Sequence, residues 1–191
     1  MFKVGLGFLF ACVFALVFDQ FIIESILVPT PSMSPTILPN ERIYVQKWPK
    51  PNLKRFDIVV IQLEYPKKKI IKRIIGLPGE CIQLKNSYEV YIDGKKRLYS
   101  SKTGKNLKED DHEISLEPHP IYRFPTVFGK ETFCLSENEY YVLGDKRKAS
   151  LDSRFFGSIY RDQILGIARL TWYSYDKKNK KFRWDQIGFL N

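Results

Sequence analysis

The chain has 191 residues, of which 44% are hydrophobic and 15% aromatic, and its 31 Lys and Arg against 21 Asp and Glu give a net charge of +10. This composition excludes an intrinsically disordered chain, a collagen-like repeat and a multi-pass membrane protein, and the length suits one domain with an appendage. Three Cys are too few for a disulfide-stapled mini-protein, and two His exclude a three-histidine metal site.

The N-terminal segment is apolar. Residues 4–18 contain no charged side chain, and three more apolar residues, 21–23, follow Asp19 and Gln20. A helix over residues 4–23 would rise about 30 Å, which matches the core of a bilayer. Each of its Leu, Ile, Val and Phe residues contributes about −0.5 kcal/mol to the free energy of membrane insertion. Together they outweigh the cost of about +3 kcal/mol for placing Asp19 in the membrane. We therefore predict a transmembrane anchor at 4–23.

A cleaved secretory signal or a buried core helix is the alternative interpretation. A secretory signal would have a stronger basic leader, a shorter apolar core and an Ala-x-Ala-like end, and none of these is present. Lys3 precedes the apolar segment, and the next basic residue is Arg42. Because basic residues stay on the cytoplasmic side, residues 1–3 are predicted to be cytoplasmic and residues 24–191 to lie outside the cell membrane.

The remainder of the chain is predicted to be mainly β. Runs of alternating or β-branched residues indicate six strands, and Asp93-Gly94 is a strong hairpin signal. Residues 98–139 are rich in charged residues and Pro without a steady period, which indicates an insertion with a little structure of its own. The predicted strands are residues 42–46, 57–63, 70–75, 89–92, 140–143 and 164–173.

The first segment with candidate chemistry, residues 28–37, directly follows the apolar stretch. Its three prolines fix φ and remove backbone donors, so the backbone is predicted to be extended and outside any helix. A hydroxyl on such a stiff segment is held in place, as a nucleophile must be. On composition alone, a Pro/Ser/Thr linker leaving the membrane is the favoured interpretation.

The second segment, residues 70–79, places Lys72 and Arg73 between two pairs of isoleucines. In a buried strand the two side chains point to opposite faces, and burial lowers the pKa of a lysine. Lowering the pKa of Lys72 from its ordinary value to about 8 would cost roughly 3.3 kcal/mol, which a folded domain can supply. The alternative is an edge strand on which both cations are solvated.

The third segment, residues 143–157, begins where a predicted strand ends in Gly-Asp. A polar loop follows, and its side chains can form hydrogen bonds with one another and present one hydroxyl to a neighbouring lysine. The four side chains are those of Ser150, Asp152, Ser153 and Arg154. The simpler alternative is a surface turn with ordinary ion pairs.

In order and content, the three segments together resemble the motifs of type I signal peptidases, the membrane-anchored serine proteases that remove signal peptides. Residues 32–37 match the motif Ser-Met-x-Pro-Thr-aliphatic, and residues 72–79 match Lys-Arg, two aliphatics and Gly-Leu-Pro-Gly. Residues 144–154 match Gly-Asp-x-x-x-x-Ser-x-Asp-Ser-Arg. The chain departs from the family at Asn40-Glu41, where Gly-Asp is usual, and at Lys146, where Asn is usual.

The resemblance implies a catalytic pair without His or Asp. Ser32 is expected to be the nucleophile and Lys72, uncharged in the resting enzyme, the general base. Ser150 is expected to orient the lysine amine. The Ser32 N–H and the Thr30 hydroxyl are expected to form the oxyanion hole. Two ion pairs are expected as structural supports, Asp145 with Arg73 and Asp152 with Arg154. No metal or other cofactor is implied.

The implied architecture is an antiparallel β-sheet or partly open barrel as catalytic domain, with a small inserted cap, after one transmembrane helix. The implied activity is cleavage of signal peptides from exported preproteins at the outer face of the cell membrane. Preproteins and membrane phospholipids are the expected partners, nucleic acid is not, and the oligomeric state is left open. Cys81 and Cys134 would lie in an oxidising compartment, and their pairing is also open.

Three other functions stay open at this level. The chain could be a dedicated processing protease of a conjugation or pilus system, which the sequence does not separate from a general one. It could be a catalytically inactive assembly homologue, against which the presence of Ser32 and Lys72 argues. A basic membrane-surface binding module would not need that pair at all.

Overall fold

The computed structural model describes residues 22–49, 51–85, 89–97, 99–103, 106–109, 112–115 and 132–190. The predicted cytoplasmic residues 1–3 and nearly all of the predicted anchor lie outside this part of the chain. Within it, no helix has the length and apolar character needed to cross a bilayer. Ile22 and Ile23, the end of the apolar stretch, lie in a turn and in the first strand.

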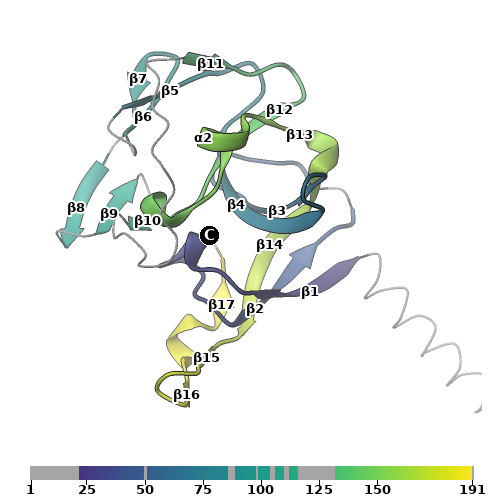
Figure 1. Cartoon of the computed structure of the whole chain (residues 1–191), viewed down its shortest axis with the longest axis vertical. Coiled ribbons are helices and arrows are strands. Elements are labelled where there is room, and N and C mark those ends of the chain that lie inside the picture. The colour runs from purple at the N-terminus through teal and green to yellow at the C-terminus, as the bar shows by residue number, and fades with distance from the viewer. Residues whose placement is uncertain are drawn as a thin grey trace, which may run out of the picture.

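An eight-stranded antiparallel sheet forms the centre of the molecule (Figure 1). Its strand order is β1-β2-β14-β3-β4-β12-β13, with β17 paired to β14. The sheet does not close on itself, since the terminal strands β1 and β13 are not paired with each other in the described residues. Its strands are β1 (Ile23–Val28), β2 (Glu41–Gln46), β3 (Ile58–Leu63), β4 (Lys68–Gly76), β12 (Glu139–Leu143), β13 (Ile159–Tyr160), β14 (Ile164–Tyr173) and β17 (Gly188–Phe189).

The mainly β, antiparallel fold class predicted from the sequence is confirmed. Each of the six predicted strands is present within two residues of its predicted bounds. Asp93 and Gly94 both have positive φ, 49° and 76°, as a tight two-residue hairpin turn requires. The strand β1 was not predicted, because its residues were divided between the apolar stretch and the proline-rich segment.

Two smaller sheets flank the central one, and Figure 1 shows them at the upper end and at one side of the molecule. The first has the order β11-β5-β6-β7 and the second the order β10-β9-β8. The second sheet and β11 fall within the predicted insertion, and β10 lies against the segment that follows β12. Their strands are β5 (Cys81–Lys85), β6 (Glu89–Ile92), β7 (Lys95–Lys96), β8 (Tyr99–Thr103), β9 (Asn106–Glu109), β10 (His112–Ser115) and β11 (Thr132–Cys134).

A disulfide joins the two cysteines whose pairing the sequence left open. Cys81 of β5 and Cys134 of β11 are direct cross-strand partners and are bonded. Leu135, the next residue, packs against Ile82 and exchanges backbone hydrogen bonds with the turn that ends β4, at Gly79 and Glu80. The chain returning from residues 98–131 is therefore attached to the strand that carries Lys72.

The hydrophobic core lies on both faces of the central sheet. One cluster includes Val28, Met33, Ile37, Ile43 and Val60, and a second includes Val59, Ile61, Ile74 and Ile167. Met33 and Ile37 come from the loop between β1 and β2, and they are almost completely buried. Apolar packing therefore fixes this loop to the sheet.

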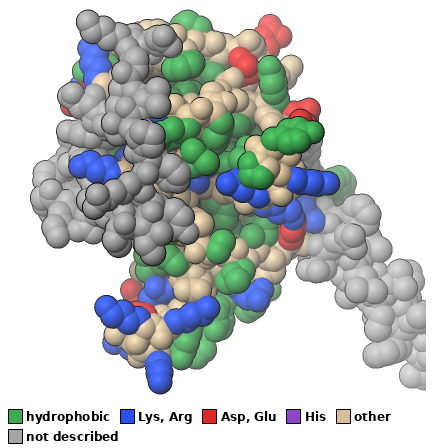
Figure 2. Space-filling view, viewed as in Figure 1, with side chains coloured by type: hydrophobic (Ala, Val, Ile, Leu, Met, Phe, Trp, Pro, Cys, Tyr) green, Lys and Arg blue, Asp and Glu red, His purple; other side chains and the backbone are tan. Residues whose placement is uncertain are grey.

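The C-terminal region is a two-stranded hairpin that extends from the end of β14, at the lower end of the view in Figure 1. Figure 2 shows Lys and Arg side chains gathered on this hairpin around hydrophobic side chains. The hairpin strands are β15 (Tyr175–Asp176) and β16 (Lys181–Phe182). The short helices in the described part of the chain are η1 (Pro31–Met33), η2 (Arg147–Ala149), α2 (Ser153–Phe156), η3 (Arg161–Gln163) and η4 (Trp184–Gln186).

Candidate active site

Ser32 lies in η1, within the loop 29–40 that connects β1 to β2. Pro31 begins this 3-10 turn, a position at which the missing N–H costs nothing. The sequence-based expectation of an extended backbone here was wrong, because Thr30 and Ser34 are extended but the three residues between them are not. Ser32 is 8% exposed, and the turn holds it at the surface of the core.

Lys72 lies in the middle of β4, which pairs with β3 on one side and with β12 on the other. Its cross-strand partner is Val59, and that of Arg73 is Ile58. Both cationic side chains are buried, Lys72 at 3% exposure and Arg73 at 0%. The alternative of a solvated edge strand is therefore excluded. As neighbours on one strand, the two side chains leave the sheet on opposite faces.

The Ser32 hydroxyl and the Lys72 amine meet in a buried position. Lys72 Nζ donates to Ser32 Oγ at 2.9 Å and to the carbonyl of Ile71 at 2.8 Å. The Thr30 hydroxyl lies 3.3 Å from the same Ser32 Oγ. Two residues that the sequence suggested for the reaction centre, Lys72 and Thr30, therefore lie within hydrogen-bonding distance of the Ser32 hydroxyl.

The buried position also changes the acidity of the amine. Burial lowers the pKa of Lys72 from 10.5 to about 8, and the carboxylates of Asp152 and Asp145 act weakly in the opposite direction. Burial is the larger effect because an ammonium loses its hydration, whereas the two carboxylates are already bound to arginines. At neutral pH a measurable fraction of the amine is therefore free of its proton.

The segment after β12 closes over Ser32 from the other side. Lys146 N–H donates to the Ser32 carbonyl at 3.0 Å, which fixes the backbone of the nucleophile. A Cβ at Gly144 would lie 2.6 Å from that carbonyl and 2.1 Å from Ser150 Oγ. Only glycine permits so close an approach of the two segments.

Ser150 is 1% exposed, and its hydroxyl has no hydrogen-bond partner among the described residues. A buried hydroxyl without a partner costs free energy, so such groups are rare in folded proteins. The segment is not a surface turn, since Ser150, Asp152, Ser153 and Arg154 are all at most 9% exposed.

Two ion pairs surround the site. Arg73 binds Asp145 through two hydrogen bonds, Nε to Oδ1 at 2.9 Å and Nη2 to Oδ2 at 2.7 Å, and both side chains are fully buried. Arg73 Nη1 also donates to the carbonyl of Phe56 at 2.8 Å. The Thr36 hydroxyl donates to Asp145 Oδ2 at 2.6 Å. Asp145 therefore joins β4 to the loop that carries Ser32.

The second pair lies within the third segment itself. Arg154 Nε and Nη2 donate to the two oxygens of Asp152 at 2.7 and 2.9 Å. Asp152 Oδ2 also accepts the Gly144 N–H at 3.0 Å, and Arg154 Nη2 donates to the Arg147 carbonyl at 2.6 Å. Ser153 Oγ accepts the Val142 N–H at 2.9 Å. These bonds fold residues 144–154 into one compact unit against β12.

Sequence reasoning missed two participants. Thr36 was part of a matched motif but was given no role, and Lys146 was noted only as a departure from the family's usual Asn. In the structure the hydroxyl of Thr36 and the backbone N–H of Lys146 bind the two neighbouring segments together. No local pattern marks either contact, because each partner is more than 100 residues away in sequence.

Comparisons with known proteins agree with this arrangement. The family model described as signal peptidase, peptidase S26, matches residues 1–173. A signal peptidase I P of Bacillus subtilis subsp. natto is 32% identical over 172 residues, which cover 88% of this chain and 87% of the relative. A signal peptidase I T of Bacillus subtilis strain 168 is 33% identical over 178 residues, covering 91% and 86%.

A crystal structure of a signal peptidase I from Enterococcus faecalis V583 is similar at a TM-score of 0.41 and 27% identity, covering 61% of this chain and 97% of that chain. The match of the family model spans all three motif segments and most of the described sheet. By this match and by the two Bacillus relatives, the chain belongs to the signal peptidase family, peptidase S26.

Proposed function

We propose that this protein is a membrane-bound serine endopeptidase that cleaves N-terminal signal peptides from exported preproteins. The observation that carries the proposal is the buried contact of 2.9 Å between Lys72 Nζ and Ser32 Oγ, with the pKa of Lys72 lowered to about 8. Family membership supports the same reaction class, since the relatives are named signal peptidase I. A binding module would have no use for an uncharged lysine beside a serine.

In the first step, uncharged Lys72 accepts the proton of the Ser32 hydroxyl while Ser32 Oγ attacks the carbonyl carbon of the scissile bond. The carbonyl oxygen becomes an oxyanion, which the Ser32 N–H and the Thr30 hydroxyl stabilise. The Lys72 ammonium then gives its proton to the departing amine, the C–N bond breaks, and the signal peptide stays on Ser32 as an ester.

In the second step, Lys72 accepts a proton from a water molecule that attacks this ester. The C–O bond to Ser32 breaks, and the proton returns to the serine oxygen. Ser150 is proposed to orient the amine during the reaction, because its buried hydroxyl lies in the segment that packs on Ser32 and has no hydrogen-bond partner among the described residues. One lysine thus acts as base and acid in turn, without His or Asp.

The substrate is proposed to bind as an extended strand. β1 forms one edge of the central sheet and leads directly into the loop that carries Ser32, so its free edge can pair with a peptide. The apolar stretch up to residue 21 is proposed to be the transmembrane anchor, because Ile22 lies in a turn and Ile23 begins β1. Residues 1–3 are proposed to lie in the cytoplasm and residues 22–191 to form the catalytic domain outside. The nucleophile then lies close to the membrane surface, where a signal peptide emerges.

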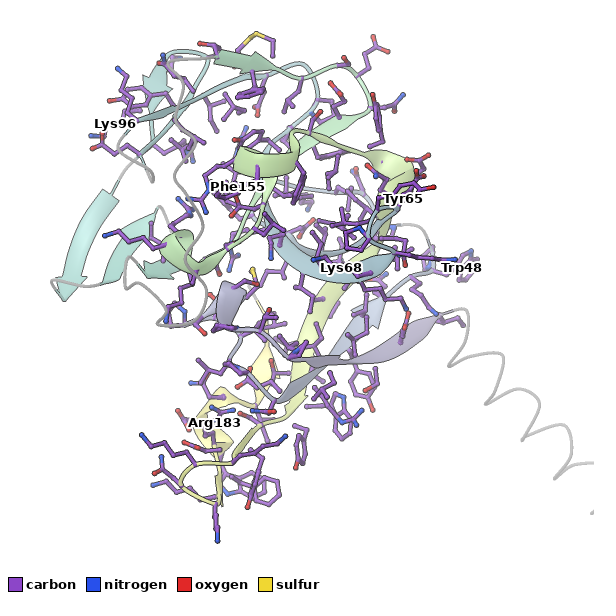
Figure 3. The ribbon with its side chains drawn as sticks, viewed as in Figure 1. Trp48, Tyr65, Lys68, Lys96, Phe155 and Arg183 are labelled. Atoms are coloured by element: carbon purple, nitrogen blue, oxygen red, sulfur yellow. A yellow bond between two sulfur atoms is a disulfide. The ribbon has the colours of Figure 1, made fainter. Side chains whose placement is uncertain are left out.

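Phospholipid contact is part of the proposal. Trp48 is 62% and Tyr65 94% exposed, and exposed lysines, including Lys68, follow Tyr65. Figure 3 shows these three side chains toward one side of the molecule. The backbone N–H of Trp48 donates to the carbonyl of Ile22, at the start of the described chain. Aromatic rings and lysines together suit the interface of an anionic membrane.

The test uses the full-length protein in phospholipid vesicles with a purified preprotein. Wild type is expected to release a mature protein and a signal peptide, whereas Ser32→Ala and Lys72→Ala are expected to release neither at a detectable rate. Lys177→Ala, in the exposed turn between β15 and β16, is the control and is expected to cleave like wild type. If Ser32→Ala and Lys72→Ala cleave as fast as wild type, the proposed reaction is wrong.

A further inference from the structure

Glu41 is a buried carboxylate that the proposed reaction does not use. It is the first residue of β2, 0% exposed, and the cross-strand partner of Val28, the last residue of β1. The two residues therefore close the loop 29–40 on which Ser32 lies. A carboxylate in such a position requires strong hydrogen bonds to offset its lost hydration.

Those hydrogen bonds come from both sides of the loop's exit. Glu41 Oε2 accepts the Leu38 N–H at 2.9 Å, and Oε1 accepts the Ser174 hydroxyl at 2.7 Å. Arg183 Nη2 lies 4.0 Å from the same Oε1. Burial raises the pKa of Glu41, whereas the hydrogen bonds and Arg183 counteract this rise.

Arg183 completes the connection to the C-terminal region. Its Nε donates to Ser174 Oγ at 2.9 Å, and its Nη2 donates to the carbonyl of Pro39 at 3.0 Å and to that of Tyr175 at 3.3 Å. In Figure 3, Arg183 lies beside the β15–β16 hairpin. Glu41 and Arg183 together thus hold the backbone N–H of Leu38 and the carbonyl of Pro39.

The loop needs this support at its exit. Its entry is continuous with β1, its centre is packed through Met33 and Ile37, and Lys146 binds the Ser32 carbonyl. At the exit, Leu38, Pro39 and Asn40 are only half-buried, Asn40 takes a left-handed φ of 68°, and its N–H donates to the Val28 carbonyl at 2.8 Å. Asparagine tolerates this conformation better than most residues, and the side chains of Glu41 and Arg183 add bonds to the half-buried residues before it.

We propose that Glu41, Ser174 and Arg183 form a positioning relay that fixes the exit of the Ser32 loop and keeps Ser32 Oγ in contact with Lys72 Nζ. The side-chain bonds of the relay go to Leu38 and Pro39 and not to the reacting atoms, so it acts through the loop. The inference depends on the proposed function for its catalytic consequence.

The test compares two glutamates with the same bonding pattern. Glu139, the first residue of β12, accepts the Ser136 N–H three residues before it at 2.9 Å and the Ser158 hydroxyl at 2.7 Å. Glu41→Ala and Glu139→Ala therefore remove equivalent bonds, but only Glu41 closes the loop with Ser32. Glu41→Gln keeps an oxygen acceptor for Leu38 and serves as the conservative variant.

Preprotein cleavage by the full chain is measured together with backbone hydrogen exchange over residues 29–40. For Glu41→Ala, kcat is expected to fall by about 10- to 100-fold with KM changed less than about twofold, because small displacements of a nucleophile have such effects. Exchange in the loop is expected to accelerate. Glu41→Gln is expected to recover most of the activity, and Glu139→Ala to leave kcat within about twofold of wild type.

The Ser174→Ala variant tests the relay from its other end, and the double variant with Glu41→Ala is expected to lose no more kcat than Glu41→Ala alone. The inference is overturned if Glu41→Ala and Glu139→Ala have equal kcat values, or if the loop keeps wild-type exchange in Glu41→Ala. Should wild type cleave no preprotein, the proposed function fails, while the exchange data still decide whether the relay holds the loop.

Discussion

Replacing Lys72 with Met should stabilise the protein at neutral pH while abolishing its activity. Burial lowers the pKa of Lys72 from 10.5 to about 8, so protonating the folded protein costs more than protonating the unfolded chain. Below pH 8 this cost is fully present, and it disappears as the pH rises towards 10.5. The shift corresponds to about 3 kcal/mol at pH 7 and about 1 kcal/mol at pH 10.

Methionine has a similar length and carries no charge, so it removes this cost. It also removes two hydrogen bonds, to Ser32 Oγ and to the Ile71 carbonyl, which are worth about 1 kcal/mol each. The net expected gain for Lys72→Met is therefore about 1 kcal/mol at pH 7, which raises Tm by about 2–4 °C in a chain of this size. At pH 10 the variant should be less stable than wild type, because the loss of the two hydrogen bonds then exceeds the small cost that remains for protonating Lys72 in the folded protein.

The assay is thermal unfolding of full-length wild type, Lys72→Met and Lys67→Met in detergent micelles, followed by tryptophan fluorescence from pH 7 to pH 10. The informative quantity is the difference in Tm between variant and wild type at each pH, which cancels titrations common to both proteins. Lys67→Met removes an exposed lysine before β4 and should not reproduce the change of sign. If the difference for Lys72→Met is independent of pH, Lys72 is not an amine with a lowered pKa in the folded protein.

Three other predictions follow from the same geometry. Gly144→Ala should reduce kcat by at least about 100-fold, because its Cβ would lie 2.1 Å from Ser150 Oγ and 2.6 Å from the Ser32 carbonyl; an active variant with wild-type kinetics would contradict the close approach. The value of kcat/KM should rise with pH and level off above about 8, as Lys72 loses its proton, and a maximum near pH 5 would contradict Lys72 as the base. Cys81→Ser should lower the free energy of unfolding by about 2–4 kcal/mol relative to the disulfide-bonded protein, and dithiothreitol should destabilise wild type but not the variant.

Much of the sheet could be predicted from the sequence because its strands carry strong local patterns. β3 and β4 are runs of β-branched residues, and β6 leads into an Asp-Gly turn with the φ values that such a turn needs. The predictions failed where a local pattern was weak or ambiguous. β1 is one example, because Ile22 and Ile23 are equally suited to the end of an apolar helix and to a strand.

The candidate site was predictable by a different route. Taken separately, each of the three segments had a simpler interpretation, and only their joint resemblance to a family indicated one reaction centre. The distances between Ser32, Lys72 and Ser150 depend on how β4 and β12 pair, which no local signal encodes. The hydrogen bond from Thr36 to Asp145 joins residues 109 positions apart in the sequence, and for that reason it could not be predicted.

The adjacent positions of Lys72 and Arg73 on β4 have a consequence for how this protein matures. A register slip of one residue would place either Arg73, whose guanidinium is permanently charged, or Ile71 at the position of Lys72 beside Ser32, so a misaligned intermediate has no working base. The contact to the Ser32 carbonyl also comes from residue 146, beyond the strand that flanks β4. Proteolytic competence thus arises only with a completed sheet, and a nascent chain poses little danger to its neighbours.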